Sequence, residues 1–182
     1  PRLDAAMAYT LVRSCCPRRI VEIGSGHSTR FFARAISDAN LDTTITAIDP
    51  QPRAYLEGLN SVKVIRKPLQ EVSLAPFDEL AAGDILAIDS SHVLMPGSDV
   101  DMLLNRVLPA LPAGVLVQVH DIFLPDDYPM DWNWRGYNEQ LAIAILLHEG
   151  LSWKVEFASH YAVTRMTDSV DSSVVGRLPL LV

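Results

Sequence analysis

The residues best placed to do chemistry begin with the segment Ile20-Val21-Glu22-Ile23-Gly24-Ser25-Gly26, in which a short apolar run meets an acid and a tight Gly-x-Gly turn. Glycines in such a turn let the backbone approach a ligand closely, because a side chain there would fill the space. A second apolar run, Thr44–Ile48, also ends in an acid, Asp49. Two acids around a glycine-rich turn suit a ligand with an adenosine half, because its hydroxyls can donate to carboxylates and little phosphate has to be neutralised.

Further polar residues follow the later apolar runs of the chain. Asp89 closes the run 84–89, and His120 and Asp121 follow the run 114–119. If these runs are parallel strands, their carboxyl ends lie along one edge of a sheet, which is where α/β proteins bind ligands. The sequence therefore predicts that these side chains gather with the two acids of the glycine-rich region at a single edge.

The elements that would position these residues alternate between strand and helix over the first 120 residues. The alternation predicts an α/β fold, a Rossmann-like, doubly wound and mostly parallel sheet with helices on both faces. An antiparallel pair of C-terminal strands is predicted at 153–157 and 161–164, and 174–182 is either a strand or a disordered end. The other predicted strands are 20–23, 44–48, 62–65, 84–89 and 114–119, and the predicted helices are 4–14, 27–37, 53–59, 100–111 and 137–148.

The chain has 182 residues, which fits a single domain. Its predicted divisions are an N-terminal helix in 1–17, a nucleoside-binding core in 18–121, a lid or acceptor loop in 122–136, and a C-terminal helix and strands in 137–182.

The composition argues against several classes of partner. The net charge of -7 disfavours a nucleic-acid partner, because phosphate binding needs a basic face. No apolar run approaches the roughly 20 residues of a membrane-spanning helix, and no signal peptide is expected in the sequence as given. The adjacent Cys15 and Cys16 are predicted to be free thiols, since a disulfide between neighbours is strained. Free thiols indicate a reducing cytoplasm.

The chain resembles the class I S-adenosylmethionine-dependent methyltransferases over roughly residues 18–165. The segment Val21–Gly26 is similar to their first motif, and Asp49 is similar to the acid that holds the ribose hydroxyls. Residues 67–71 stand where the family usually contacts adenine, and Glu22 would meet the amino-acid end of the cofactor or the loop amides. The resemblance thus implies a cofactor site made of Glu22, Gly24, Ser25, Gly26, Ser28, Asp49, Leu69, Gln70 and Asp89.

Within that family, the segments 89–92 and 119–123 resemble the metal-dependent small-molecule O-methyltransferases, a group that includes the macrolide sugar methyltransferases and cephalosporin hydroxylase-like proteins. The resemblance implies that His92 is the general base beside Asp89, and that Asp89, His120 and Asp121 bind a divalent cation, Mg²⁺ or Mn²⁺. His120 stands where the family usually has an acid, and an imidazole suits Mn²⁺, Fe²⁺ or Zn²⁺ better than Mg²⁺. The alternative is that the acids cap helices or orient loops and that both histidines only make hydrogen bonds.

The long irregular segment 122–136 and the residues just after it carry a third group of acids and aromatic rings. Such a mixture suits a polar, ring-bearing acceptor such as a sugar or a phenol, or else it is an ordinary surface loop anchored by tryptophans. Glu139 and Gln140 either face the site or cap the helix that follows. The group consists of Asp126, Asp127, Asp131, Trp132, Trp134, Arg135 and Tyr137.

These patterns favour a cytoplasmic methyltransferase that acts on a hydroxyl of a small molecule, and they are compatible with a homodimer. An NAD-linked oxidoreductase is the first alternative, since the glycine turn and Asp49 permit it. Against it stand Glu22 before the turn, Ser28 in place of a third glycine, and the lack of an evident Tyr-x-x-x-Lys pair. A non-catalytic binding module is the second alternative, because a fold does not determine a function.

Overall fold

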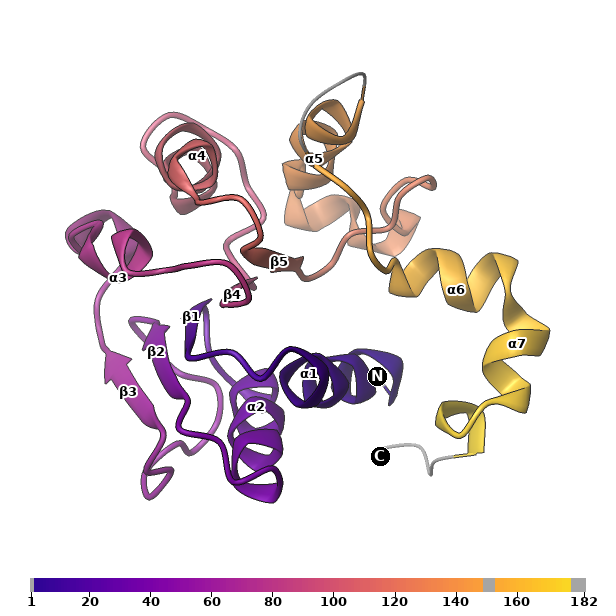
Figure 1. Cartoon of the computed structure of the whole chain (residues 1–182). Coiled ribbons are helices and arrows are strands. Elements are labelled where there is room, and N and C mark those ends of the chain that lie inside the picture. The colour runs from indigo at the N-terminus through magenta and orange to yellow at the C-terminus, as the bar shows by residue number, and fades with distance from the viewer. Residues whose placement is uncertain (1, 149–152, 178–182) are drawn as a thin grey trace.

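The computed structural model describes residues 2–148 and 153–177, and at its centre is a parallel sheet of five strands in the order β3-β2-β1-β4-β5 (Figure 1). The strand order reverses between β1 and β4, so the sheet has a switch point there. All five predicted parallel strands are confirmed, with bounds that differ by at most two residues. They are β1 (Arg19–Ile23), β2 (Thr44–Ile48), β3 (Val62–Ile65), β4 (Ile85–Ile88) and β5 (Leu116–Val119).

The register of the sheet aligns the carboxyl ends of its central strands. Ile23 of β1 lies beside Ile48 of β2 and Ile88 of β4, and Ile88 lies beside Val119 of β5. Because the strands run in the same direction, the residues that follow these four positions share one edge. These residues are Gly24, Asp49, Asp89 and His120.

Helices cover both faces of the sheet, as predicted (Figure 1). On one face, α1 (Arg2–Cys15) and α2 (His27–Asp38) pack against the strands through residues such as Val12 and Phe32. The other face is covered through Phe77 and Leu103, and all four residues of β4 are buried, as expected for a strand between two layers of helix. The elements on this second face are η1 (Leu69–Glu71), α3 (Ala75–Asp78), α4 (Asp99–Met102), η2 (Leu103–Val107) and η3 (Leu108–Ala110).

The predicted helix at 53–59 is wrong, because these residues form turns and bends. Leu56 is the buried apolar residue of the segment, while Tyr55 is 75% exposed. Gly58 has a φ of +84°, which lies outside the helical region. A short helix gains most of its stability from an apolar face that packs on the core, and this segment lacks one.

The predicted antiparallel strands at 153–157 and 161–164 are also wrong. The first segment has no regular structure, and the second lies inside α6 (Ser159–Arg165). An alternating strand would bury Tyr161 and Val163 on one face, but both are exposed, whereas Ala162 between them is buried. A single buried alanine between two exposed apolar residues fits the short helix α6 and does not fit a half-buried strand.

The rest of the C-terminal region forms an arm of short helices. It consists of α6, α7 (Thr167–Ser172) and η5 (Val175–Arg177), and Figure 1 shows it reaching away from the sheet. The predicted strand or disordered end at 174–182 begins in η5, and 178–182 lie outside the described residues. None of the helices in the described ranges is long and apolar enough to cross a membrane. Both cysteines are free, as predicted.

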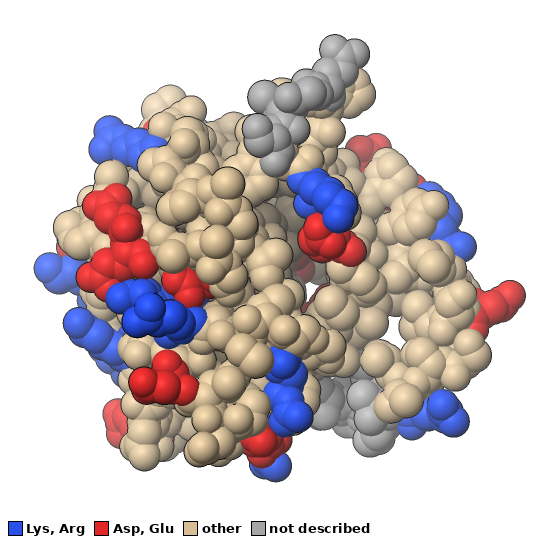
Figure 2. Space-filling view, viewed as in Figure 1, with Lys and Arg blue, Asp and Glu red and all other residues tan. Residues whose placement is uncertain are grey.

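Two further elements surround the edge where the strands end. The predicted loop 122–136 contains a 3-10 helix, η4 (Met130–Arg135), and the predicted helix at 137–148 is α5 (Glu139–Leu147). The face of the molecule in Figure 2 has acidic and basic side chains interspersed, so neither sign gathers into one large patch on that face.

Candidate functional site at the carboxyl edge of the sheet

The glycine-rich turn brings the backbone of the first strand end against the end of β4. Gly24 has a φ of +74°, and a Cβ added to it would overlap the carbonyl oxygen of Asp89. Its backbone N–H donates to the carbonyl of Ile48 at 3.0 Å. A residue with a side chain is therefore excluded twice, by the dihedral angle and by the lack of space. Gly24, which follows β1, therefore contacts the ends of both β2 and β4.

Asp49 links the end of β2 to the same turn. Its Oδ2 accepts hydrogen bonds from the backbone N–H of Ser25 at 2.6 Å and from the Ser25 hydroxyl at 2.9 Å. Its Oδ1 accepts from the backbone N–H of Gln51 at 2.7 Å. A carboxylate offers about four acceptor positions, so Oδ1 keeps capacity for a further donor such as a ribose hydroxyl.

Glu22 lies beneath the turn and has only 1% of its surface exposed. Its Oε1 accepts from the Ser28 hydroxyl and its Oε2 from the Thr29 hydroxyl, each at 2.6 Å. Burial raises the pKa of Glu22 to about 7, although the two hydroxyl hydrogen bonds act in the opposite direction. Glu22 therefore fastens the start of α2 from below, so it does not present its carboxylate to a ligand in this structure.

A cavity of about 360 Å³ opens at the strand ends. Six of the predicted cofactor residues line it, while the other three, Glu22, Gly26 and Ser28, are not among its lining residues. Arg53 and Asp99 also line the cavity and lie in no motif of the sequence, and Ser91, which lies within the 89–92 motif, lines it without having been predicted as a site residue. The six predicted lining residues are Gly24, Ser25, Asp49, Leu69, Gln70 and Asp89.

Beside the cavity, Asp89, His92 and Asp121 form a cluster with one ligand atom each, and these atoms lie within 4.8 Å of one another. His92 Nε2 lies 3.2 Å from Asp89 Oδ1 and 3.7 Å from Asp121 Oδ2. Nδ1 of the neighbouring His120 lies 3.0 Å from Asp121 Oδ1 and 3.8 Å from Asp89 Oδ1. The structure thus brings together all four residues that were predicted to act as base or metal ligands.

The donor set of this cluster fits a divalent cation. Two carboxylates approach one point, and carboxylate and imidazole are ligands shared by Mn²⁺, Fe²⁺ and Zn²⁺. His120 Nδ1 is buried and makes no hydrogen bond to the described part of the chain, which is unusual for a polar atom. A cation would account for the close approach of the two carboxylates.

Glu139 supports His92 from the side opposite the carboxylates. Its Oε2 lies 2.9 Å from His92 Nδ1, and both residues are 2% exposed. The Ser90 hydroxyl donates to both oxygens of Glu139 at 3.1 Å and accepts from the backbone N–H of His92. This buried network holds the imidazole in place. Of the two alternatives predicted for Glu139, facing the site or capping the helix, the structure shows that it faces the site.

The charges of the cluster perturb its titration. Burial alone would lower the pKa of His92, but hydrogen bonds to Asp89 and Glu139 and the charges of Glu139 and Asp121 raise it to about 9. Burial alone would raise the pKa of Asp89, yet the hydrogen bond from His92 and the charges of His120, His92 and Arg53 lower it. Without a cation, His92 is therefore an imidazolium between carboxylates at neutral pH and has no lone pair to accept a proton.

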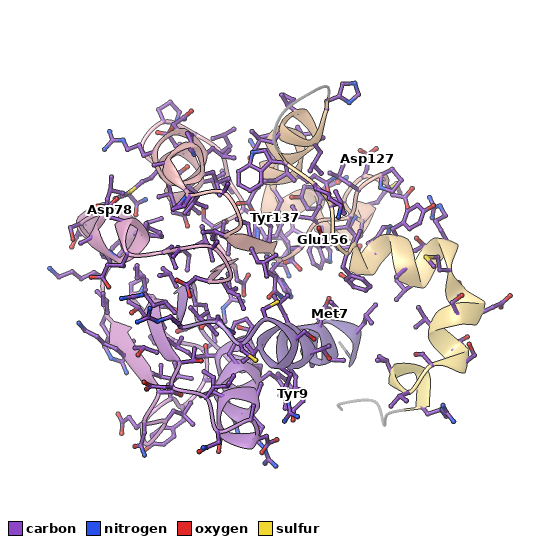
Figure 3. All side chains as sticks on the ribbon, in the orientation of Figure 1. Met7, Tyr9, Asp78, Asp127, Tyr137 and Glu156 are labelled. Carbon is purple, nitrogen blue, oxygen red and sulfur yellow. The ribbon has the colours of Figure 1, made fainter. Side chains whose placement is uncertain are left out.

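Aromatic rings from the loop after β5 form one wall beside His92. The ring of Tyr137 lies 4.5 Å from the imidazole of His92, and Trp132 and Tyr128 pack edge-on against Tyr137. The Arg135 guanidinium lies 4.5 Å from the Trp132 ring and donates to the Tyr137 hydroxyl at 3.0 Å. Figure 3 shows Tyr137 near the end of β5.

The other predicted loop residues lie farther from the cluster. Asp126 binds His160 at 2.8 Å and Arg165 at 2.6 Å, so it ties the loop to α6. Asp127, Asp131 and Trp134 are exposed, and Figure 3 places Asp127 toward α6, away from Tyr137. Their predicted part in an acceptor site therefore has less support than that of Trp132 and Tyr137.

Gln140 and Asn138 hold the loops on either side of α5. Gln140 Oε1 accepts from the backbone N–H of Phe123 at 2.9 Å, and its Nε2 donates to the carbonyl of Asp126 at 3.3 Å. Asn138 Oδ1 accepts from the backbone N–H of Leu94 at 2.6 Å, and its Nδ2 donates to the Leu94 carbonyl at 3.2 Å. Local sequence gave no sign of these contacts, because each joins residues far apart in the chain.

Comparison with known proteins agrees with this geometry. A family model described as a methyltransferase domain matches residues 21–122. The apo-structure of CmcI is similar, with a TM-score of 0.51 and 15% identity, over 80% of this chain and 60% of that chain. A second CmcI structure, described as Mg-SAM, has a TM-score of 0.47 and 19% identity, over 78% and 58%. The search of curated proteins gives no match.

The two kinds of similarity support different conclusions. This chain spans about three fifths of the length of the CmcI chains, and at such low identity the likeness to the apo-structure concerns the fold alone. The matched family segment runs from β1 to just beyond β5, which includes the glycine-rich turn and the Asp89–Asp121 cluster. The resemblance seen in the motifs is therefore confirmed, and the chain belongs to the methyltransferase domain family.

Proposed function

We propose that this protein transfers a methyl group from S-adenosylmethionine to a hydroxyl oxygen of a small molecule, with a divalent cation at the cluster of Asp89, His92 and Asp121. One observation carries the proposal. Asp89 both lines the cavity at the glycine-rich turn and belongs to the carboxylate–histidine cluster. A cofactor in the cavity and an acceptor at the cluster would therefore meet at one residue.

The cofactor half of the site has groups suited to a nucleoside that carries little phosphate. Gly24 allows close approach of the backbone, Asp49 has acceptor capacity for ribose hydroxyls, and Leu69 and Gln70 line the cavity where the family contacts adenine. S-adenosylmethionine supplies an electrophilic methyl group on a sulfonium. Acidic residues near the cavity suit this positive charge better than the pyrophosphate of NAD, which disfavours the oxidoreductase alternative together with the family membership.

The acceptor half has groups suited to a polar ring. The rings of Tyr137 and Trp132 offer an apolar wall beside His92, and such walls bind sugars and phenols by stacking. Asp89 and Asp121 would hold the cation, whose chemistry is to lower the pKa of an acceptor hydroxyl and to orient it. A small-molecule acceptor, a cytoplasmic location and a homodimer are all parts of this proposal.

Isothermal titration calorimetry with S-adenosylmethionine on the full chain tests the proposal. We expect saturable binding by the native protein and binding roughly 10- to 100-fold weaker for Asp49→Asn, because a hydrogen bond to a charged group is worth about 1.5–3 kcal/mol. Asp42→Asn, at an exposed position, is the matched control and should bind like the native protein.

Two results would decide against the proposal. If the folded protein shows no binding heat at millimolar S-adenosylmethionine, the cofactor assignment fails. If it instead shows a saturable change in NADH fluorescence, the oxidoreductase alternative replaces it. Binding without turnover of any sugar or phenol acceptor, with Mn²⁺ present, would favour the non-catalytic binding module.

A further inference from the structure

We infer that His92, and not His120, is the histidine that binds the divalent cation, and that Glu139 is the positioning residue that aims His92 at Asp89 and Asp121. This inference rests on the proposed function, in which a cation sits at the cluster. It departs from the ligand set that the motifs imply, Asp89, His120 and Asp121 with His92 as the base. It also concerns Glu139, to which no motif assigned a role.

The first support is the position of the ring nitrogens. His92 Nε2 lies between the two carboxylates, 3.2 Å from Asp89 Oδ1 and 3.7 Å from Asp121 Oδ2. Ligand atoms about 2.0–2.2 Å from one cation lie at most about 4.4 Å apart, and the three atoms here lie within 4.8 Å of one another, so a small inward shift would complete the site. The cluster whose ligand atoms meet this condition contains His92 and does not contain His120.

The second support is the contact on the far side of the imidazole. A carboxylate can only accept, so the 2.9 Å contact with Glu139 Oε2 places a hydrogen on His92 Nδ1. In a neutral ring this leaves the lone pair on Nε2, the atom that faces Asp89 and Asp121. Metal-binding histidines usually donate their other N–H to a carboxylate or a carbonyl, which fixes the tautomer and the ring orientation. His92 has such a partner in Glu139.

The third support is that the chain holds His92 in an unusual backbone conformation. His92 has a φ of +59° and Asp121 a φ of +53°, which makes them two of the four non-glycine residues with positive φ in the described ranges. Such conformations cost about 1–3 kcal/mol each and concentrate at functional sites. The carbonyl of His92 also accepts from the backbone N–H groups of Asn138 and Glu139 at 3.0 and 3.2 Å, so the start of α5 clamps the residue.

His120 lies at similar distances from the two carboxylates, but in the described part of the chain it has neither a carboxylate partner like Glu139 nor a positive φ. Its Nδ1 lies 3.0 Å from Asp121, its own neighbour in the chain, and 3.8 Å from Asp89. Its side chain is 37% exposed, and this Nδ1 makes no hydrogen bond within residues 2–148 and 153–177. A ring without a fixed tautomer is the weaker ligand of the two. Because an imidazole takes part, the site should prefer Mn²⁺ to Mg²⁺.

Pulsed electron paramagnetic resonance of bound Mn²⁺ tests which histidine is the ligand. The full chain is stripped with a chelator and loaded with MnCl₂, and the coupling of a directly bound ¹⁴N nucleus is recorded. We expect this nitrogen coupling in the native protein and in His120→Asn, and its loss in His92→Gln. Labelling with ¹⁵N-histidine should change the coupling in the native protein, which identifies its source.

The possible outcomes separate the two assignments. Loss of the coupling in His120→Asn with Mn²⁺ still bound, or its persistence in His92→Gln, overturns the inference. A coupling-free spectrum of the native protein, or no Mn²⁺ binding at millimolar concentration, overturns it as well. If His92→Gln fails to fold, the native protein and His120→Asn decide the question alone.

Glu139→Gln tests the positioning role. An amide can also donate to Nδ1, so the preference for the correct tautomer is lost although the shape of the side chain is kept. We expect the Mn²⁺ affinity to fall roughly 10- to 100-fold, while the affinity of the metal-free protein for S-adenosylmethionine stays unchanged. Glu57→Gln, at an exposed position, is the matched control. An unchanged Mn²⁺ affinity, or an equal loss of both affinities, contradicts the positioning role.

The same samples separate this inference from the proposed function. If the metal-free protein binds S-adenosylmethionine but Mn²⁺ shows no nitrogen coupling, only the assignment of His92 and Glu139 fails. If Mn²⁺ shows the coupling but S-adenosylmethionine does not bind, the proposed function fails and the metal site stands.

Discussion

The proposed cofactor half of the site, around Gly24 and Asp49, and the proposed acceptor half, around His92 and Glu139, differ in how far apart in the sequence their contacting residues lie. In the cofactor half, Asp49 binds Ser25 across two neighbouring strands, 24 residues apart in the chain. In the acceptor half, Glu139 binds His92 over 47 residues and Asn138 binds Leu94 over 44 residues. The sheet itself therefore holds the first half, whereas the second half depends on how α5 docks against the loop after β4.

This difference teaches that the two halves can be altered separately. A change in the glycine-rich turn disturbs the end of β1 and, through Gly24, the end of β4. A change at the start of α5 alters the loop 89–94 and leaves the β1–β2 edge untouched. Substitutions at the start of α5 should therefore weaken cation binding and leave cofactor binding unchanged, whereas substitutions of Gly24 reach both halves through Asp89.

The largest effect is expected from Gly24→Ala. The new methyl group would overlap the carbonyl of Asp89, and alanine at a φ of +74° is strained. We expect the affinity for S-adenosylmethionine to fall by about 100-fold or more and the free energy of unfolding to fall by about 2–4 kcal/mol. Calorimetry and urea denaturation measure these two quantities.

Gly58→Ala is the matched control for Gly24→Ala. Gly58 has a similar φ of +84°, but a Cβ added there meets no atom within 4 Å. It should lose only about 1 kcal/mol of stability, from backbone strain, and keep its cofactor affinity. If the two variants show the same cofactor affinity and the same free energy of unfolding, the tight contact of Gly24 with Asp89 contributes to neither.

A second prediction concerns the pH dependence that Glu22 gives to the cofactor half. Its carboxyl has a pKa of about 7 in the folded protein, whereas its ordinary pKa is 4.5. Between these values the unfolded chain has released the proton and the folded protein retains it, so raising the pH favours unfolding. The free energy of unfolding should therefore fall by about 3 kcal/mol between pH 4.5 and 7, with no further loss above pH 7.

Urea denaturation at several pH values checks this dependence. In Glu22→Gln the loss of stability between pH 5 and 7 should be smaller than in the native protein by about 2–3 kcal/mol. Glu57→Gln, at an exposed site, should follow the native curve. A native curve that is parallel to that of Glu22→Gln would show that the Glu22 carboxyl titrates normally.

The same contrast explains what the sequence could predict. Short apolar runs that end in polar residues predicted all five parallel strands. Because parallel strands align their carboxyl ends, the same runs predicted that Asp49, Asp89 and Asp121 gather at one edge. The glycine-rich turn was equally visible, since its residues are adjacent in the chain. These features depend on local pattern and on a general rule of sheet geometry.

The remaining features depend on packing between distant segments. Glu139 looked like an ordinary first-turn acid of a helix, and only its contact with His92 shows that it belongs to the site. Residues 161–164 have the composition of a strand, but His160 and Arg165 on either side of them both bind Asp126 from a helix. No local pattern encodes such contacts, so the acceptor half was predicted less well than the cofactor half.

The smallest effect is expected from Asn138→Ala, which removes the side-chain hydrogen bonds between the start of α5 and Leu94 in the loop after β4. The variant leaves the backbone N–H and carbonyl of Leu94 without their side-chain partner, which costs about 1–2 kcal/mol of unfolding free energy. Because that loop carries His92, the affinity for Mn²⁺ should fall by about threefold to tenfold, while the affinity for S-adenosylmethionine is kept. Urea denaturation and the two titrations give these values, with the exposed Asn133→Ala as the control. An equal loss of both affinities would mean that the two halves of the site are coupled through the end of β4, where Asp89 belongs to both.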